Sequence, residues 1–391
     1  MLRTSLIAIT RLAALSCGLA APALAESEND RVVDYLSGLQ SHFERVTAHE
    51  DIVGFAAAVI EAGEPIFVYT HGETAAGSGR EVSETTLFRA ASVSKTFTGT
   101  LFALLEAEGQ LDLEAPVPTE VMDLQGERSP TIAEVLSHRT GLPPNAYDNM
   151  LEAGREVGFI RDRLSGVDLI CPVGGCYTYQ NIAFSSVEVL AEDATGQSYD
   201  ELLTRELFDR IGLPSASLGA SGLTAAEDWA APHRGWRRTT NQAGDPGTYY
   251  DRTPSAAGVN LSLNDMIVWA QAQLGTRDGL PADVRARAHQ RLTPTRRETR
   301  RLGELRERVS ATWYGLGWRV YDWGERTLVM HSGYLSGYGA QIVLEPETGF
   351  AFVALWNSDN RPAWSLWPAV MDLRTGQGDG DRWVRRFLED D

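Results

Sequence analysis

The segment AASVSKTFTG (residues 90–99) contains the only lysine of the chain. The sequence has 35 lysine and arginine residues, and every one except Lys95 is an arginine. Lys95 follows Ser92 by three positions, and residues 92–109 have the apolar spacing of a helix that stops at Gly109. Because positions i and i+3 share one face of a helix, the Lys95 amine can reach the Ser92 hydroxyl.

A lysine at this position can perform chemistry that an arginine cannot. Serine becomes a nucleophile when a nearby base accepts its proton. A guanidinium stays protonated in proteins, whereas desolvation or neighbouring positive charge lowers the pKa of a lysine. The helix start also offers N–H groups to negative charge that develops at Ser92. The alternative is an ordinary helix cap at Ser92 and a solvated Lys95, and the single lysine favours the catalytic interpretation.

Both ends of the chain predict strands of one sheet. Residues 54–73 are typical of a β-hairpin, and the apolar period changes to two again between residues 316 and 357. Helical patterns that end at glycines fill most of the middle. We therefore expect an α/β lobe from residues 26–110 and 305–391, with a helical lobe inserted over residues 111–304.

The first 25 residues predict a secretory signal peptide. Arg3 and Arg11 precede an apolar run over residues 12–21, and Ala-Leu-Ala at 23–25 matches a cleavage site. The run is too short to cross a bilayer. We expect a mature single domain over residues 26–391, with no stable membrane span and a periplasmic or secreted location.

The cysteines, the histidines and the net charge indicate which modifications, metals and partners to expect. Cys17 ends the sequence ALSC, which leaves lipoprotein processing as an alternative to cleavage. Cys171 and Cys176 in CPVGGC are expected to form a disulfide after export, with two reduced thiols as the alternative. No histidines have metal-ligand spacing, so no metal is predicted. A formal net charge of −18 without a basic patch argues against nucleic-acid binding.

Three segments in this order resemble one enzyme family. LFRAASVSKTFTG (87–99), TIAEVLSHRTGLP (131–143) and HSGYLSGYGAQIVLEPETGF (331–350) are similar to the serine β-lactamase and penicillin-binding protein family, especially its class C branch. That branch includes D-Ala-D-Ala carboxypeptidases, D-aminopeptidases and family VIII esterases. The resemblance covers nearly the whole mature chain. It implies the β-lactamase/transpeptidase-like fold of the α/β (α+β) class, an antiparallel sheet flanked by helices with an inserted mainly helical lobe, and no cofactor.

The resemblance also implies roles for individual residues. Ser92 would be the nucleophile, with Lys95 and Tyr179 sharing the proton transfer. Tyr179 begins a Y-x-N motif whose Asn181 would orient the lysine and the substrate amide. A phenol held beside a cationic amine can exist as a phenolate and act as a base, which fits this role for Tyr179. Without the flanking resemblance, Tyr179 would be interpreted as a core aromatic in a loop.

The third motif departs from the family pattern. The family has K-T-G where this chain has His331, Ser332 and Gly333, and the N–H groups of Ser92 and Tyr334 would form the oxyanion hole. A lysine there stays charged and can hold a substrate carboxylate, whereas a histidine loses its charge through neutral pH. This change argues against an efficient β-lactamase. The sequence SDN at residues 358–360 follows the third motif, so it is given no catalytic role.

Together these features predict an exported serine hydrolase that forms an acyl-enzyme on Ser92. Its expected substrates are small molecules or peptidoglycan-derived, with a β-lactam or D-amino-acid amide bond to be cleaved. Two alternatives remain, a family VIII-type carboxylesterase and a penicillin-binding sensor that is acylated without turnover.

Overall fold

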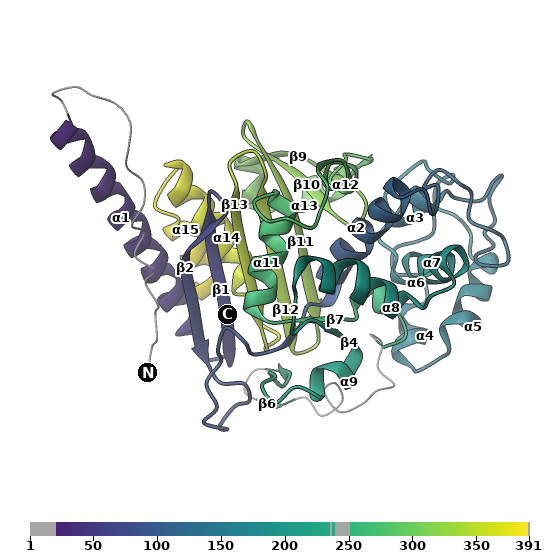
Figure 1. Ribbon diagram of the computed structural model, residues 1–391, viewed down its shortest axis with the longest axis horizontal. Coiled ribbons are helices and arrows are strands. Elements are labelled where there is room, and N and C mark those ends of the chain that lie inside the picture. The colour runs from purple at the N-terminus through teal and green to yellow at the C-terminus, as the bar shows by residue number, and fades with distance from the viewer. Residues whose placement is uncertain (1–20, 235–236, 239–250, 390–391) are drawn as a thin grey trace.

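The computed structural model describes residues 21–234, 237–238 and 251–389 (Figure 1). Most of the expected signal peptide, including Cys17, lies outside these residues. The rest of it, residues 21–25, begins helix α1 (Ala21–Thr47). No helix in the described part of the chain is both long enough and apolar enough to span a membrane.

An eight-stranded antiparallel sheet joins the two ends of the described chain, in the order β2-β1-β13-β12-β11-β10-β9-β8. The N-terminal hairpin pairs with the C-terminal strands through β1 and β13, where Ala57 lies opposite Ala354. The hairpins expected near both ends are confirmed. The strands are β1 (Gly54–Glu61), β2 (Glu64–Gly72), β8 (Thr293–Pro294), β9 (Val309–Tyr314), β10 (Arg319–Trp323), β11 (Arg326–Leu335), β12 (Tyr338–Glu345) and β13 (Phe350–Trp356).

Helices cover both faces of this sheet (Figure 1). Alternate residues of β1 enter different cores, because side chains of a strand point to opposite faces. Phe55 packs in one core with Trp367 of α14 (Ala363–Thr375) and Trp383 of α15 (Asp381–Glu389), and α1 also contacts these two helices. Ala56 packs in the other core, with α2 (Ser94–Ala107) and α11 (Leu263–Leu274). We call the α14–α15 side the outer face of the sheet.

Of the remaining helices, α3 to α8 lie together to the right of the large sheet in the view of Figure 1. The helices are α3 (Ile132–Leu136), α4 (Asp148–Glu152), α5 (Val157–Asp162), α6 (Asn181–Ser185), α7 (Val187–Thr195), α8 (Tyr199–Leu203), α9 (Gly219–Thr224), α10 (Pro254–Ala257), α12 (Ala282–Ala288) and α13 (Arg296–Arg301). The short strands are β3 (Phe88–Arg89), β4 (Ser217–Leu218), β5 (His233–Arg234), β6 (Arg237–Arg238) and β7 (Val259–Leu261). A π-helical segment (Thr204–Asp209) and 3₁₀ turns η1 (Ala91–Val93), η2 (Arg163–Gly166) and η4 (Gly303–Glu307) complete the described elements.

The structure differs from the expected boundary between the two lobes. Residues up to 304 were assigned to the helical lobe, but α11 packs on β1, β12 and β13, and β8 is the edge strand of the large sheet. An amphipathic helix pattern shows that one face is buried and does not show against which element it packs. The fold otherwise matches the expected antiparallel sheet flanked by helices.

Candidate active site

Ser92 lies in the one-turn helix η1, immediately before α2. The expected helix start at Ser92 is therefore two residues early, and no side chain caps η1. Ala91 adopts a positive φ of 50°, a conformation that non-glycine residues rarely adopt and that is found near functional sites. The Ser94 hydroxyl donates to the Ala91 carbonyl at 2.6 Å, which fixes this turn.

Ser92, Lys95 and Tyr179 meet as the sequence predicts. Lys95 Nζ lies 3.4 Å from Ser92 Oγ, and the Tyr179 hydroxyl donates to the same oxygen at 2.9 Å. The lysine nitrogen also lies 4.8 Å from the centre of the Tyr179 ring. One serine oxygen is thus in contact with two groups that can accept or donate a proton.

The surroundings of Lys95 favour a neutral amine. The side chain is fully buried, and this burial lowers the pKa of Lys95 well below its usual value. The nearby Arg319 lowers the pKa further, while Asp148 opposes the shift. Two hydrogen bonds of 2.8 Å, to Asn181 Oδ1 and the Ala256 carbonyl, use the two N–H donors of a neutral amine. Its lone pair is then free to accept the Ser92 proton.

Tyr179 is in an environment that favours the protonated phenol. Burial raises the pKa of Tyr179 well above its usual value, although the Ser92 hydrogen bond and Arg319 act in the opposite direction. A phenolate is therefore not favoured in the resting site. A neutral phenol beside a neutral amine carries the same net charge as a phenolate beside an ammonium, and burial favours the uncharged pair.

Asn181 is oriented by a residue that the sequence did not single out. Its amide Nδ2 donates to Asp148 Oδ2 at 2.9 Å, so its Oδ1 is turned toward Lys95. Asp148 stands at the start of α4, and Asn181 begins α6. A single aspartate in a loop-rich region carries no spacing signal, so only the folded arrangement identifies it.

His331 lies near the site but is not available as a cation. It is 1% exposed, and burial, Arg319 and Lys95 lower its pKa well below the usual value. Nδ1 lies 2.9 Å from the Ser332 carbonyl, and Nε2 lies 2.9 Å from the Tyr314 hydroxyl. A neutral ring that donates from Nδ1 and accepts at Nε2 satisfies both contacts. The structure therefore places His331 as a buried, uncharged support rather than an exposed contact for a substrate carboxylate.

Strand β11 offers a free edge next to Ser92. Its pairing with β10 stops where Met330 lies opposite Arg319, so the following residues 331–335 have no β10 partner. The turn η1 packs against this part of β11. A Cβ on Gly333 would lie 2.2 Å from the Ala90 carbonyl and 3.1 Å from the Ser92 nitrogen, so only glycine allows this approach. The oxyanion hole formed by the Ser92 and Tyr334 N–H groups remains a prediction.

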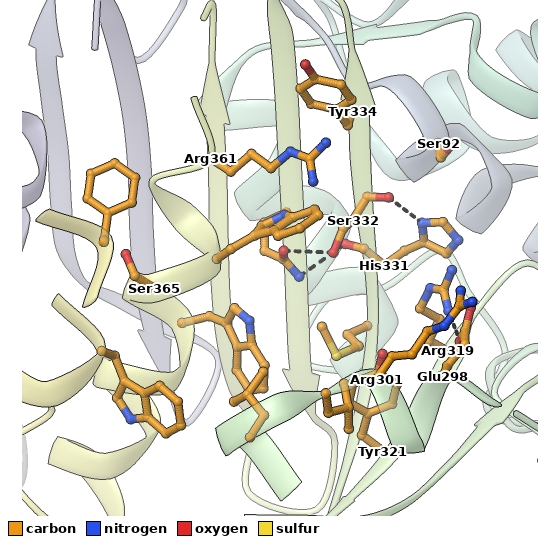
Figure 2. A pocket seen from close by; sticks show the side chains of 18 of the residues that line it. Ser92, Glu298, Arg301, Arg319, Tyr321, His331, Ser332, Tyr334, Arg361 and Ser365 are labelled. Carbon is orange, nitrogen blue, oxygen red and sulfur yellow. Dashed lines mark hydrogen bonds and ion pairs between the residues drawn. The ribbon is translucent and has the colours of Figure 1, made fainter. Parts of the chain in front are cut away.

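A cavity of about 780 Å³ opens at Ser92 and contains most of the expected site residues (Figure 2). Tyr179, His331, Ser332 and Tyr334 line it. Two arginines also reach it and differ in their pairing. Arg319 is ion-paired with Glu298, whereas Arg361 lies over the rings of Tyr334 and Trp364, at 4.2 and 4.3 Å, and has no carboxylate within ion-pair distance among the described residues.

Cys171 and Cys176 are joined by a disulfide in the structure, with their Cα atoms 6.2 Å apart. The enclosed loop packs against residues 138–141, since Gly174 N donates to the Arg139 carbonyl and Thr178 N to the His138 carbonyl. Tyr179 follows directly, so this loop helps to place the phenol. Among the described residues, no group of three or more metal-ligating side chains could hold a metal ion.

Comparisons with known proteins match most of the chain to one family. A family model described as Beta-lactamase matches residues 39–373. The chain is 27% identical over 343 residues to penicillin-binding protein 4 of Amycolatopsis lactamdurans, and the alignment covers 81% of this chain and 84% of that protein. It is 30% identical over 236 residues to a D-aminopeptidase of Gluconobacter oxydans, covering 58% of this chain and 43% of the relative, so the match spans less than half of that enzyme.

A solved structure gives the same fold. The class C β-lactamase of Rhodobacter sphaeroides superimposes with a TM-score of 0.70 at 23% identity, covering 87% of this chain and 99% of that one. The family model spans most of the sequence, and the Ser92, Lys95 and Tyr179 cluster lies where the resemblance predicts. The chain therefore belongs to the β-lactamase family.

Proposed function

We propose that the protein is an exported serine hydrolase that forms an acyl-enzyme on Ser92 and cleaves β-lactam or D-amino-acid amide bonds. The observation that carries the proposal is the pair of contacts on Ser92 Oγ. A buried lysine whose two N–H donors are already used lies on one side, and a protonated tyrosine lies on the other. This arrangement can remove a proton from the serine and return one to a leaving group.

The reaction would use these groups in sequence. Ser92 Oγ attacks the substrate carbonyl carbon as its proton passes to Lys95 Nζ, and the carbonyl oxygen becomes an oxyanion. When the tetrahedral intermediate collapses, the bond to the leaving nitrogen breaks and Tyr179 donates a proton to that nitrogen. Lys95 then reprotonates Tyr179. Water then attacks the carbonyl carbon of the acyl-enzyme and gives its proton to Tyr179, whose own proton passes to Lys95. Lys95 protonates Ser92 Oγ as the acyl bond breaks, which releases Ser92.

Export is part of the proposal. It is supported by the arginine-flanked apolar run at the N-terminus and by the disulfide between Cys171 and Cys176, because such bonds persist in oxidising compartments. A periplasmic or secreted enzyme would meet peptidoglycan-derived amides and β-lactams, which fits the proposed substrates.

A carboxylesterase is the second candidate, and the state of His331 favours it. A lysine in the third motif would offer a permanent charge to a substrate carboxylate, but His331 is buried and uncharged. A neutral ester needs no such charge. The same acyl-enzyme chemistry serves esters, since only the leaving atom changes from nitrogen to oxygen.

The test is the mass of the intact mature protein after mixing with excess benzylpenicillin, with hydrolysed drug assayed in the same samples. Rapid drug loss, with an adduct only at the earliest times, would support a hydrolase of β-lactams. A persistent adduct would support a penicillin-binding peptidase or a sensor, and release of D-alanine from a D-Ala-D-Ala peptide separates these two. Neither adduct nor drug loss would leave the esterase as the better candidate.

The Ser92→Ala variant is the control for each of these results. It should give neither adduct nor turnover and should retain the cooperative unfolding of the wild type. An adduct or full activity in this variant would contradict the assignment of Ser92 as the nucleophile.

A further inference from the structure

The cavity that begins at Ser92 continues over the outer face of the sheet. Met330 belongs to the outer core with Trp367, and Ser332 lies two residues further along β11, on the same face. The same cavity reaches Trp383 and Phe387 of α15. Figure 2 shows Ser92 and Ser365 on opposite sides of Ser332, which stands between the nucleophile and this extension.

The extension is mostly apolar, although Arg301 and Arg386 also line it, and we call it the outer groove. Met330, Trp367 and Trp383 are almost fully buried beneath it, while Leu302, Leu305 and Phe387 are half-buried along it. Leu302 lies between α13 and η4, and the other five come from η4, β11, α14 and α15. Large apolar side chains that line a cavity instead of filling it are typical of a ligand site.

Polar groups occur where the outer groove meets the nucleophile. Ser332 Oγ donates to Gln341 Oε1 at 2.9 Å, and both residues line the cavity. Arg361, which has no described ion-pair partner, stands above them with its side chain over Tyr334 (Figure 2). A ligand that spans the cavity would therefore meet polar groups next to its reacting bond and apolar groups further away.

We infer that the substrate carries an extended apolar chain, alkyl or aryl, that lies in the outer groove while its scissile carbonyl is at Ser92. This inference rests on the proposed acyl-enzyme function and names the class of substrate. A small D-alanine amide would leave the apolar groove to water, whereas an alkyl chain of several carbons replaces that water with contacts to Met330 and the tryptophans.

The first experiment measures kcat/KM of the wild type on two ester series. One series varies the acyl chain of p-nitrophenyl esters from acetyl to octanoyl, and the other varies the alcohol of acetate esters from ethyl to octyl. We expect kcat/KM to rise at least about tenfold along one series, since each buried methylene contributes up to about fourfold. The series that responds identifies which side of the scissile bond enters the groove.

Variants at Ser365 connect this response to the outer groove. Ser365 lines the cavity from α14, so Ser365→Phe places a ring in the groove, while Ser365→Ala is the matched control that adds no bulk. The octanoyl-to-acetyl ratio of kcat/KM, or the equivalent alcohol ratio, should fall about tenfold in Ser365→Phe and stay near the wild-type value in Ser365→Ala. A ratio within one variant does not depend on the fraction of protein that is folded. Leu305→Trp, which lines the cavity from η4, is a second blocking variant if Ser365→Phe does not fold.

The two possible failures can be told apart. If no ester, amide or β-lactam acylates Ser92, the proposed function fails. If short esters are hydrolysed but neither series depends on chain length, or the dependence survives both blocking variants, only the apolar-chain inference is overturned. If esters are not substrates but β-lactams acylate Ser92, the acylation rates of penicillins with acetyl to octanoyl side chains provide the same comparison.

Discussion

The Tyr314 hydroxyl lies 2.9 Å from Nε2 of His331, deep between β9 and β11. Burial raises the pKa of Tyr314 well above its usual value, so this phenol keeps its proton and donates it to the histidine. The other ring nitrogen, Nδ1, donates to the Ser332 carbonyl at 2.9 Å. His331 therefore supports the third motif as a neutral ring with both nitrogens in use, and it adds no positive charge to the substrate site.

This contact predicts that the titration of His331 does not change the ratio of kcat/KM between a carboxylate-bearing substrate and a neutral ester as the pH varies. If the ring were cationic, kcat/KM for a carboxylate-bearing substrate would fall relative to a neutral ester as the pH rises through its pKa. Because burial, Arg319 and Lys95 lower the pKa of His331 below its usual value, the ring is neutral through neutral pH, and we expect parallel profiles for the two substrates between pH 6.5 and 8. Both profiles should fall at lower pH as Lys95 becomes protonated, since the pKa of Lys95 is also lowered. Profiles that diverge near neutral pH, and converge in His331→Asn, would contradict this assignment.

Arg361 is the cation that we expect a substrate carboxylate to meet. It lies over Tyr334 and Trp364 in the cavity of Ser92, and among the described residues no carboxylate lies within ion-pair distance of it, although Asp359 accepts a hydrogen bond from the Tyr334 hydroxyl. Arg361→Gln should lower kcat/KM for an anionic substrate about 10- to 100-fold relative to a neutral substrate with the same scissile bond, because a charged hydrogen bond is lost. Arg361→Lys keeps the charge but not the planar stacking, so it should recover part of the ratio. An unchanged ratio in Arg361→Gln would exclude this role.

The sequence was enough to predict the parts of this site that depend on local spacing. Ser92 and Lys95 are three positions apart, so the continuous helical turns of η1 and α2 bring them together. Alternating apolar residues predicted the hairpins, because a half-buried strand repeats every two residues whatever its neighbours are. The family resemblance then brought in Tyr179 and Asn181, which lie more than 80 positions from the serine.

The remaining features depend on which distant surfaces meet, and spacing does not contain that information. Asp148 becomes important only because α4 lies beside α6, where its carboxylate orients Asn181. The neutral state of His331 follows from burial beneath Tyr314. Arg361 enters the cavity because its loop, which follows the SDN sequence, returns beside β11. The outer groove needs four elements in contact, so no single segment predicts it.

Replacing Lys95 with arginine tests the base directly. The guanidinium keeps a positive charge but cannot accept the Ser92 proton, and it presents donors where a lone pair is needed. We expect Lys95→Arg to lose on the order of 10³-fold in kcat or more, in the range of a lost general base. Pre-steady-state acylation by a chromogenic ester measures this step, with Ser92→Ala as the background. Acylation within tenfold of the wild type would show that another group removes the proton.

The disulfide should stabilise the fold and the position of Tyr179. Closing a loop as short as that between Cys171 and Cys176 contributes roughly 2 kcal/mol to the free energy of unfolding. We expect a double serine variant to lose about this much free energy of unfolding, and urea titrations measure the difference. Its kcat should also fall, because the loop that precedes Tyr179 loses its constraint. Thiol labelling of the wild type should detect free Cys171 and Cys176 only after reduction, and labelling before reduction would show that the bond does not form.

We expect the titration of Glu188 to make the free energy of unfolding depend on pH. Glu188 is hydrogen-bonded to the segment that contacts Lys95. Its Oε1 accepts hydrogen bonds from the backbone N–H and the hydroxyl of Ser255, at 3.0 and 2.5 Å. The next residue, Ala256, supplies the carbonyl that accepts a hydrogen bond from the lysine. Burial raises the pKa of Glu188 to about 7, and this shift outweighs the two hydrogen bonds and the nearby Arg161, which lower it.

A raised carboxyl pKa means that the folded state holds this proton more tightly than the unfolded state. As the pH rises from 4.5 to 7, the unfolded chain loses the proton first, and the folded state becomes less stable by about 3 kcal/mol or less. Glu188→Gln carries no titratable proton and can still accept from Ser255. The free energy of unfolding of this variant minus that of the wild type should therefore increase between pH 4.5 and 7.5, and comparing the two cancels every other titrating group. Urea titrations at several pH values measure this difference, and a difference that stays constant with pH would show that Glu188 ionises as an ordinary carboxylate.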